Sequence, residues 1–304
     1  MGLTGVTARA YVTNLGSGNV YVFNTANNAL IGIIEVDDGP YGAAVTPDGL
    51  RVFVTTIVNG TVNVISTATN TVIDTIPIGF FPGELVITPD GTRAYAVLIG
   101  EDAVAVIDTE ENTVSDKIPV RDGPNSIAVT PDGTRVYVSH FGDDFVSVID
   151  TETNTVVDSV TVGTFPAGIA ITPDGTRAYV INSGDETVSV IQLDDNTVTG
   201  PPIPVGFDPR QIAMTTDGTR AYVTNFRDDT VTVIDTVNNQ PVDTIPVLDG
   251  PIGAAVTPDG TRVYITNANA NSVTVISTAD NKVIETSGVG ADPNFVAISP
   301  PILE

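Results

Sequence analysis

Seven copies of one sequence unit predict an all-β fold: a single seven-bladed β-propeller with four antiparallel strands per blade. The turn sequence Thr-Pro-Asp-Gly and its variants recur at spacings of 42, 42, 42, 43, 42 and 42 residues. The first residues of the seven turns are Thr46, Thr88, Thr130, Thr172, Thr215, Thr257 and Ser299. Each unit also carries a proline six residues before the turn and four runs rich in β-branched residues, with no apolar period of 3.6 residues. A repeat near 40 residues that contains several short strands is typical of propeller blades.

The four runs predict strands A to D of one blade. In residues 167–205 they read AGIAIT, RAYVIN, TVSVIQ and NTVTGPPIPV. Asp-Gly closes the tight turn between strands A and B, where glycine accepts a positive φ. Strand D contains Pro77, Pro119, Pro204, Pro241 and Pro246. Proline cannot donate to a strand ladder, so strand D is expected at the outer edge of each blade.

The two ends of the chain predict how the ring closes. The sequence starts at a strand B (residues 9–14) and stops at a strand A (residues 295–299). The last strand must therefore pair with the first three. We expect one domain over residues 1–304, with blade 1 formed by residues 8–36 plus 294–299.

Composition excludes several classes of function. Twelve Lys and Arg against 37 Asp and Glu give a formal net charge of −25, which repels nucleic acid. No run of 18 apolar residues is present, so we expect no membrane insertion. The absence of cysteine rules out disulfides and thiolate metal sites. No secretory signal is visible, but we expect Met1-Gly2 and Leu303-Glu304 to be cloning remnants, so the compartment, cytoplasmic or extracellular, stays open.

The repeat resembles a known family. Residues 11–14 and 222–225 read YVTN, and residues 264–267, 179–182 and 137–140 are close variants of it. On these residues and on the TPDG turn the chain is similar to the YVTN-repeat β-propellers. That resemblance implies the fold. For function the resemblance implies four classes without choosing between them: archaeal surface-layer modules, lactonase-like enzymes, streptogramin-lyase-like enzymes and cofactor-carrying domains.

Departures from the repeat gather on one face of the predicted propeller. The A–B and C–D turns share one face and are short and uniform, whereas the B–C and D–A loops share the other, which we call the variable face. Loops on a rigid scaffold commonly carry binding residues. The three arginines outside the repeat position fall there: Arg121, Arg210 and Arg227. Seven of the ten phenylalanines do so as well: Phe80, Phe81, Phe141, Phe165, Phe207, Phe226 and Phe295.

These residues, with Tyr41, predict an asymmetric pocket at the mouth of the central channel. Such a pocket suits a small organic molecule with an apolar body and an anionic or carbonyl group that Arg can bind. The alternative is that the phenylalanines only fill gaps between blades.

Glu84 and His140 are the candidates for acid–base catalysis. At the second position after the blade proline the seven units carry Gly42, Glu84, Ser126, Gly168, Gln211, Gly253 and Phe295, so Glu84 is the one carboxylate. Apolar surroundings would raise its pKa toward neutrality. His140, the single histidine, lies on the next blade. The pair predicts metal-independent lyase, isomerase or cyclase chemistry, or a lactonase-like activity, with Arg121 or Arg210 stabilising an oxyanion. The alternative is that His140 replaces a structural Asn and Glu84 is solvated.

We expect no metal and no cofactor. A Ca²⁺ ion in the axial channel is the weaker alternative, resting on Asp38, Asp122, Asp208, Asp249 and Asp292 in the D–A loops. The alternative function is a non-catalytic surface-layer, adhesion or interaction module with a protein partner. Near-symmetric polar loops would favour that module, and blades 1 and 7 have such loops, whereas blades 2 to 6 do not.

Overall fold

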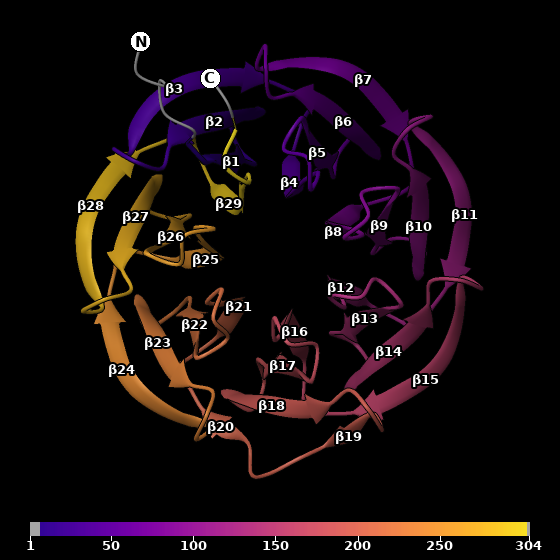
Figure 1. Ribbon diagram of the computed structural model, residues 1–304, viewed down its shortest axis with the longest axis vertical. Helices are drawn as coiled ribbons and strands as arrows, with labels where there is room; N and C mark the ends of the chain where they lie inside the picture. The colour runs from indigo at the N-terminus through magenta and orange to yellow at the C-terminus, as the bar shows by residue number, and fades with distance from the viewer. Residues whose placement is uncertain (1–6, 303–304) are drawn as a thin grey trace.

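Seven antiparallel sheets stand around a central axis in the computed structural model, which describes residues 7–302 (Figure 1). The predicted seven-bladed propeller of four-stranded blades is confirmed. Met1-Gly2 and Leu303-Glu304, expected to be cloning remnants, lie outside the described residues. Among residues 7–302 there is no helix of the length and apolarity needed to cross a bilayer.

Each blade runs from an innermost strand beside the axis to an outermost strand at the rim. In that order, blade 1 contains β29 (Pro293–Ile298), β1 (Arg9–Asn14), β2 (Asn19–Asn24) and β3 (Ala29–Glu35). Blade 2 contains β4 (Pro40–Val45), β5 (Arg51–Thr56), β6 (Thr61–Ser66) and β7 (Thr71–Pro77). Blade 3 contains β8 (Pro82–Ile87), β9 (Arg93–Leu98), β10 (Ala103–Asp108) and β11 (Thr113–Pro119). Blade 4 contains β12 (Pro124–Val129), β13 (Arg135–His140), β14 (Phe145–Asp150) and β15 (Thr155–Thr161).

The remaining three blades follow the same order. Blade 5 contains β16 (Pro166–Ile171), β17 (Arg177–Asn182), β18 (Thr187–Gln192) and a divided outer strand, β19 (Thr197–Val198) and β20 (Ile203–Pro204). Blade 6 contains β21 (Pro209–Met214), β22 (Arg220–Asn225), β23 (Thr230–Asp235) and β24 (Gln240–Pro246). Blade 7 contains β25 (Pro251–Val256), β26 (Arg262–Asn267), β27 (Ser272–Ser277) and β28 (Lys282–Gly288). The outer strand of blade 5 is divided where Pro201-Pro202 interrupts the ladder.

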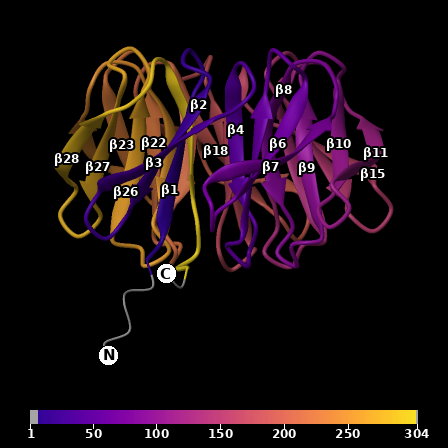
Figure 2. The same ribbon diagram turned by 90° about the horizontal axis from the view of Figure 1, so that it is seen from above.

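The ring is closed by pairing the last strand with the first. β29 runs antiparallel to β1, with Ala10 opposite Ile298 and Val12 opposite Val296. In Figure 1 the yellow β29 lies on the axial side of the indigo β1. β1 begins and β29 ends on the face of the tight A–B turns, the lower face in Figure 2, and Thr7 and Ile302 pair with each other just beyond them.

The apolar core is divided among the seven interfaces between blades. One cluster joins blades 2 and 3, for example through Phe53 of β5 and Ala94 of β9, and each of the other neighbouring pairs has its own cluster. Each sheet therefore buries both faces, which explains why its inner strands are apolar with little alternation.

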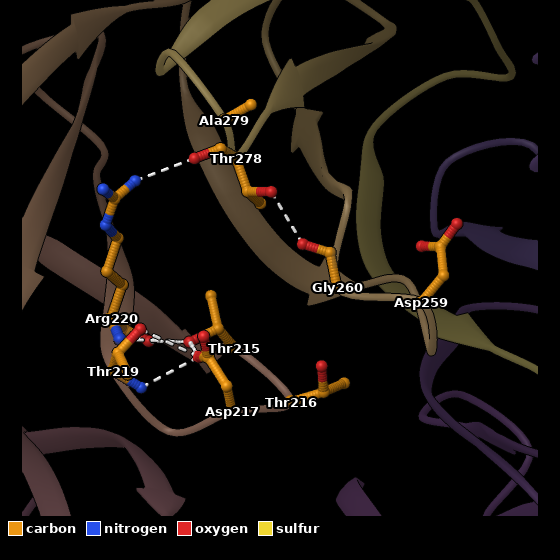
Figure 3. Close-up of a pocket in the computed structure, with 9 residues that line it drawn as sticks. All are labelled: Thr215, Thr216, Asp217, Thr219, Arg220, Asp259, Gly260, Thr278 and Ala279. Atoms are coloured by element: carbon orange, nitrogen blue, oxygen red, sulfur yellow. Dashed lines mark hydrogen bonds between the residues drawn. The ribbon is translucent and has the colours of Figure 1, made fainter.

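The repeated arginine links six of the seven blades to the next blade. Arg220 Nη1 of blade 6 donates to the carbonyl of Thr278 in blade 7 at 2.7 Å (Figure 3). The same bond joins Arg9 to Thr67, Arg51 to Thr109, Arg93 to Thr151, Arg177 to Thr236 and Arg262 to Thr25. Arg135 differs and forms an ion pair with Asp150 of its own blade.

The tyrosine of the YVTN sequence makes a second link. The hydroxyl of Tyr95 donates to Asn154 Oδ1 in the next blade at 2.9 Å, and four other tyrosines repeat this bond. The receiving asparagine adopts a positive φ in the C–D turn, which Asn tolerates better than most residues. In several blades its Nδ2 also donates to a carboxylate on the preceding outer strand, as Asn196 does to Asp158 at 2.9 Å. Asn112 makes the same bond to Asp74, although blade 2 has Phe53 in place of the tyrosine.

The link between blades 1 and 2 lacks this carboxylate. Gly32 of β3 pairs with Val22 in the register in which Asp74 of β7 pairs with Val64. Within residues 7–302, Asn70 Oδ1 is buried without a hydrogen-bond partner, and the Tyr11 hydroxyl does not form the bond to Asn70 that its counterparts form to their asparagines. A Cβ at Gly32 would lie 3.2 Å from Asn70 Nδ2, so a side chain there would contact this amide.

Gly32→Asp is expected to stabilise the propeller. The new carboxylate would accept from Asn70 and hold the amide toward Tyr11, which adds about 1 kcal/mol to the free energy of unfolding and raises Tm by about 2–4 °C. Asp74→Gly in blade 2 is the matched control and should lower Tm by a similar amount. Thermal unfolding followed by circular dichroism measures both. A Tm for Gly32→Asp at or below that of the unmodified protein would contradict the proposed role of this carboxylate.

Candidate functional site

A β-bulge in every innermost strand points two residues toward the axis. The register of blade 3 shifts between Pro82 and Leu85, which frees residues 83–84 from regular pairing, and the other six blades shift at the same place. Bulges commonly redirect side chains beside functional sites. The two positions after each blade proline therefore form a double ring around the channel.

The threonine of the YVTN sequence holds these bulges in place. Thr224 Oγ1 accepts a hydrogen bond from the Gln211 N–H of its own blade at 3.0 Å and donates to the Ile252 carbonyl of the next blade at 2.7 Å. Thr13 bonds in the same way to Phe295 and Tyr41 across the closing blade. The scaffold thus fixes the backbone of the double ring while leaving its side chains free to vary.

One cavity opens on this double ring, with a volume of about 350 Å³. Ten of its lining residues are ring positions, and two are aromatic residues of the B–C loops. They are Tyr41, Glu84, Asn125, Ala167, Arg210, Gln211, Ile252, Gly253, Asn294 and Phe295, with Phe141 and Phe226. We call this cavity the axial pocket; its size is in the range of small-molecule sites.

Glu84 is held in the axial pocket by two neutral donors. Ser126 Oγ of blade 4 donates to Glu84 Oε2 at 2.6 Å, and Gln211 Nε2 of blade 6 donates to Oε1 at 2.7 Å. Gln211 reaches Glu84 over Gly168 of blade 5, where a Cβ would lie 2.5 Å from Gln211 Oε1. That oxygen accepts from the Ile212 N–H at 2.9 Å, which fixes the orientation of the amide. Glu84 is thereby positioned by side chains of blades 4 and 6.

Burial raises the pKa of Glu84 from 4.5 to about 7. Hydrogen bonds from Ser126, the Ile127 N–H and Gln211 lower the pKa and offset only part of the burial effect. None of these donors carries a charge. Glu84 can therefore gain or lose a proton near neutral pH, as a general acid or base must.

Tyr41 and Arg210 complete the polar part of the pocket. Burial, and then the nearby charge of Glu84, raise the pKa of Tyr41 to about 12, so its hydroxyl remains a donor. Arg210 Nη2 pairs with Asp208 Oδ2 at 2.8 Å, and its guanidinium lies 5.2 Å from the centre of the Phe226 ring. Its side chain is 41% exposed, so the cation stays accessible at the pocket mouth.

The other two predicted arginines lie outside the pocket lining. Arg227 pairs with Asp208 at 3.3 Å and stacks over Phe207, and Arg121 pairs with Asp143 at 3.0 Å. The structure thus brings Arg210 alone of the three to the axial pocket.

His140 lies outside the pocket lining as well, fully buried in blade 4. Its Nδ1–H donates to the Arg121 carbonyl at 3.0 Å, and Nε2 then accepts from Ser147 Oγ at 2.8 Å. Asn182 makes the corresponding bond to Ser189 in blade 5. Burial lowers the pKa of His140, which disfavours the charged ring. The predicted pairing of Glu84 with His140 is not formed, because both ring nitrogens bond other groups.

Six of the seven predicted phenylalanines divide into two groups, and the seventh, Phe207, contacts Arg227. Phe141, Phe226 and Phe295 line the axial pocket, and Phe165 stacks on Phe141 with ring centres 5.0 Å apart. Phe80 and Phe81 line a separate groove with Ile57 and Val58, and they are 72% and 57% exposed. Their exposure does not fit gap filling between blades.

Phe81 and Phe165 also have strained backbones. Their φ angles are 48° and 52°, at the position before the blade proline that is Gly or Asp in the other blades. A bulky residue at positive φ costs on the order of 1 kcal/mol or more, and such strain is concentrated at functional sites.

Sequence reasoning missed half of the pocket lining. Asn125, Ala167, Ile252 and Asn294 occupy the first position after the blade proline, and Gln211 and Gly253 occupy the second. The repeat itself could have identified them, because it places the residue directly after each blade proline on the same kind of bulge as Glu84.

A second cavity, on the tight-turn face, belongs to the scaffold. It has a volume of about 390 Å³ and lies between blades 6 and 7, with Asp217 bonding its own turn and Thr278 bonding Gly260 (Figure 3). The corresponding repeat positions of blades 3 and 4 line a similar cavity of about 290 Å³. A cavity that recurs with the repeat reflects the architecture and offers no distinctive chemistry.

The structure tests metal binding only indirectly. No group of three or more His, Asp or Glu side chains gathers at one point in residues 7–302. Asp208, one of the carboxylates considered for Ca²⁺, is engaged by Arg210 and Arg227. The expectation that the protein needs no cofactor stays a prediction.

The fold and the axial pocket define a seven-bladed β-propeller with an asymmetric pocket at the axis of its variable face. The chain belongs to the lactonase family of seven-bladed β-propellers, whose family model matches residues 1–201, 82–233 and 169–300. The resemblance to YVTN-repeat proteins stays a prediction. No curated protein matches the sequence.

Several solved structures share the fold. Hydrazine synthase of Kuenenia stuttgartiensis is 24% identical with a TM-score of 0.81, covering 88% of this chain and 92% of its own. A functionally unknown protein from Desulfotomaculum acetoxidans is 20% identical with a TM-score of 0.84, covering 96% and 99%. The dihydro-heme d1 dehydrogenase NirN in complex with DHE is 14% identical with a TM-score of 0.74, covering 97% and 76%. At these identities the similarity establishes the fold alone.

Ionisation of Glu84 is expected to reduce folding stability. Its pKa is raised from 4.5 to about 7, so between these values the folded protein holds a proton that the unfolded chain releases. The free energy of unfolding should therefore fall as the pH rises through this range, by up to about 3 kcal/mol, and level off above it. Glu84→Gln should lack this component. Urea titrations of both proteins at about pH 5 and about pH 8 measure the difference. An equal pH dependence in the two proteins would contradict the raised pKa.

Proposed function

We propose that the axial pocket hydrolyses a cyclic ester, with Glu84 as the general acid–base group. The observation that carries the proposal is the setting of Glu84: it is the one carboxylate among seven equivalent ring positions, and it faces a pocket of about 350 Å³ with a pKa of about 7. Membership of the lactonase family supports the choice of ester.

The reaction needs only one acid–base group. Ionised Glu84 takes a proton from a water molecule as the water oxygen bonds to the ester carbonyl carbon. The tetrahedral intermediate carries its negative charge on the former carbonyl oxygen, where the Arg210 cation and the Tyr41 hydroxyl can donate. When the ring C–O bond breaks, protonated Glu84 returns its proton to the leaving alkoxide. The products are one hydroxyl and one carboxylic acid, which ionises in water.

Hydrolysis fits this pocket better than elimination or isomerisation. Those reactions commonly use one group to remove a proton and a second to deliver one. The second candidate, His140, has both ring nitrogens bonded elsewhere, and Tyr41 with a pKa of about 12 is a poor base. A single carboxyl that takes and then returns the same proton is sufficient for ester hydrolysis.

The apolar wall of the pocket would bind the body of the substrate. Phe141, Phe226, Phe295 and Ile252 supply that surface, and Asn125 and Asn294 supply amide groups for its polar substituents. The fold-level neighbour NirN was solved with a small molecule bound, which supports ligand binding by a propeller of this kind.

Glu84→Gln should abolish lactone hydrolysis while leaving binding intact. Gln preserves the shape of the side chain but cannot accept the proton, so we expect a loss of about 10²–10⁴ in kcat with little change in KM. In the unmodified protein the rate should rise with pH and level off above about 7, the pKa of Glu84. Acid release from a panel of γ- and δ-lactones, recorded in a pH-stat, measures both.

Glu186→Gln is the matched control for this experiment. Glu186 lies on the variable face but outside the axial pocket, and its side chain is exposed. It should retain full activity. Turnover by Glu84→Gln at the rate of the unmodified protein would overturn the proposed mechanism, and failure of the unmodified protein to hydrolyse any lactone would overturn the proposed function.

Arg210→Met should weaken transition-state binding. Removing the cation takes away one group that stabilises the oxyanion, and we expect kcat/KM to fall by about a hundredfold. Arg227→Met is the control, because Arg227 pairs with the same Asp208 but does not line the pocket. It should cost less than about threefold. Equal losses in the two variants would show that Arg210 acts only through the ion pair with Asp208.

A further inference from the structure

The outer strands of the blades differ in how their free edges are protected. An edge strand presents unpaired N–H and C=O groups, and charged residues or prolines normally prevent another strand from pairing there. Five outer strands carry a carboxylate in mid-strand: Asp74, Asp116, Asp158, Asp243 and Glu285. The outer strand of blade 5 is interrupted at Pro201-Pro202.

β3 of blade 1 has neither a mid-strand carboxylate nor an interruption by proline. It reads ALIGIIE, with Gly32 in the carboxylate position, no proline, and Glu35 as its one charge, at the last residue. Leu30, Ile31 and Ile33 are 46%, 41% and 48% exposed. Glycine within a strand frequently marks a place where another backbone approaches closely.

We propose that this edge is a dimer interface at which β3 pairs antiparallel with β3 of a second copy of the chain. A two-fold axis pairs a strand with itself, so the uncharged run from Ala29 to Ile34 would meet an identical run, and the two four-stranded blades would become one sheet. The backbone hydrogen bonds and the three aliphatic side chains supply the contact.

The distribution of charge among the outer strands favours β3 as the strand that pairs with its own copy. Two chains of formal charge −25 repel one another, and like charges opposite each other in a ladder are destabilising. Self-pairing of β7, β11, β15, β24 or β28 would bring mid-strand carboxylates close to their own copies. Along β3, from Ala29 to Ile34, no such repulsion arises.

The proposed interface is independent of the axial pocket. β3 lies on the outer circumference of the ring (Figure 1). The axial pocket is lined by the residues of the innermost-strand bulges around the axis, on the variable face. Dimerisation through β3 would therefore leave the pocket mouth open, and the dimer can be tested without any substrate.

Sedimentation velocity of the full chain tests the proposal. We expect the unmodified protein to reach twice the chain mass as its concentration rises to about 0.1 mM, and to do so more readily at high salt, which screens the net charge. Ile31→Asp should sediment at the mass of one chain. Gly32→Asp should do the same while keeping or raising Tm, which separates loss of the interface from loss of the fold.

Ile73→Asp in blade 2 is the matched control. Ile73 precedes Asp74 as Ile31 precedes Gly32, and it is 55% exposed. This variant should remain dimeric. A monomeric unmodified protein across the concentration range, a dimer that survives both β3 substitutions, or a dimer lost equally in Ile73→Asp would each overturn the proposal.

Discussion

The contact between neighbouring blades is the constraint on which the rest of this structure depends. No blade covers its own apolar faces; each buries them against the next, and the repeated arginine and tyrosine then bond the C–D turn of that neighbour. Most of the repeated residues therefore form one kind of contact, which occurs between each pair of neighbouring blades. Pairing of β29 with β1 closes the ring. Positions that take part in this interface have little freedom to change, which leaves the strand-A bulges and the variable-face loops to carry individual chemistry.

The bulges of the innermost strands carry the variable side chains that line the axial pocket. Each exposes two side chains to the axis on a backbone that the neighbouring Thr or Ser holds in most blades. Seven equivalent positions carry three glycines, one serine, one glutamine, one phenylalanine and one glutamate. The glycines give the longer side chains room to cross the channel, as Gln211 does over Gly168. Glu84 is consequently surrounded by protein and by neutral donors, and this setting, more than any nearby charge, raises its pKa.

The sequence allowed the fold and Glu84 to be predicted because both depend on the repeat spacing alone. A period of 42 residues gives the number of blades, and comparison of equivalent positions identifies the one carboxylate facing the axis. The repeat spacing left two roles open for His140, catalysis or replacement of a structural Asn. The choice depends on which groups meet its two nitrogens, and these are the Arg121 carbonyl of a D–A loop and Ser147 of β14. Phe80 and Phe81 were expected at the pocket, yet they line a separate groove. The repeat spacing places both residues in a D–A loop, but spacing does not show toward which cavity a loop side chain points.

The acidic character of the protein bears on the proposed reaction in one further respect. A neutral lactone is not repelled by a chain of formal charge −25, whereas the carboxylate formed from it is. At physiological ionic strength this repulsion acts over only about 8 Å, so it operates at the pocket mouth rather than at long range. Within that distance Arg210 opposes the repulsion and binds the developing anion. Its ion pair with Asp208 weakens this binding. Arg210, partly neutralised by Asp208, would therefore stabilise the short-lived oxyanion, while the net negative charge of the protein would favour release of the carboxylate product.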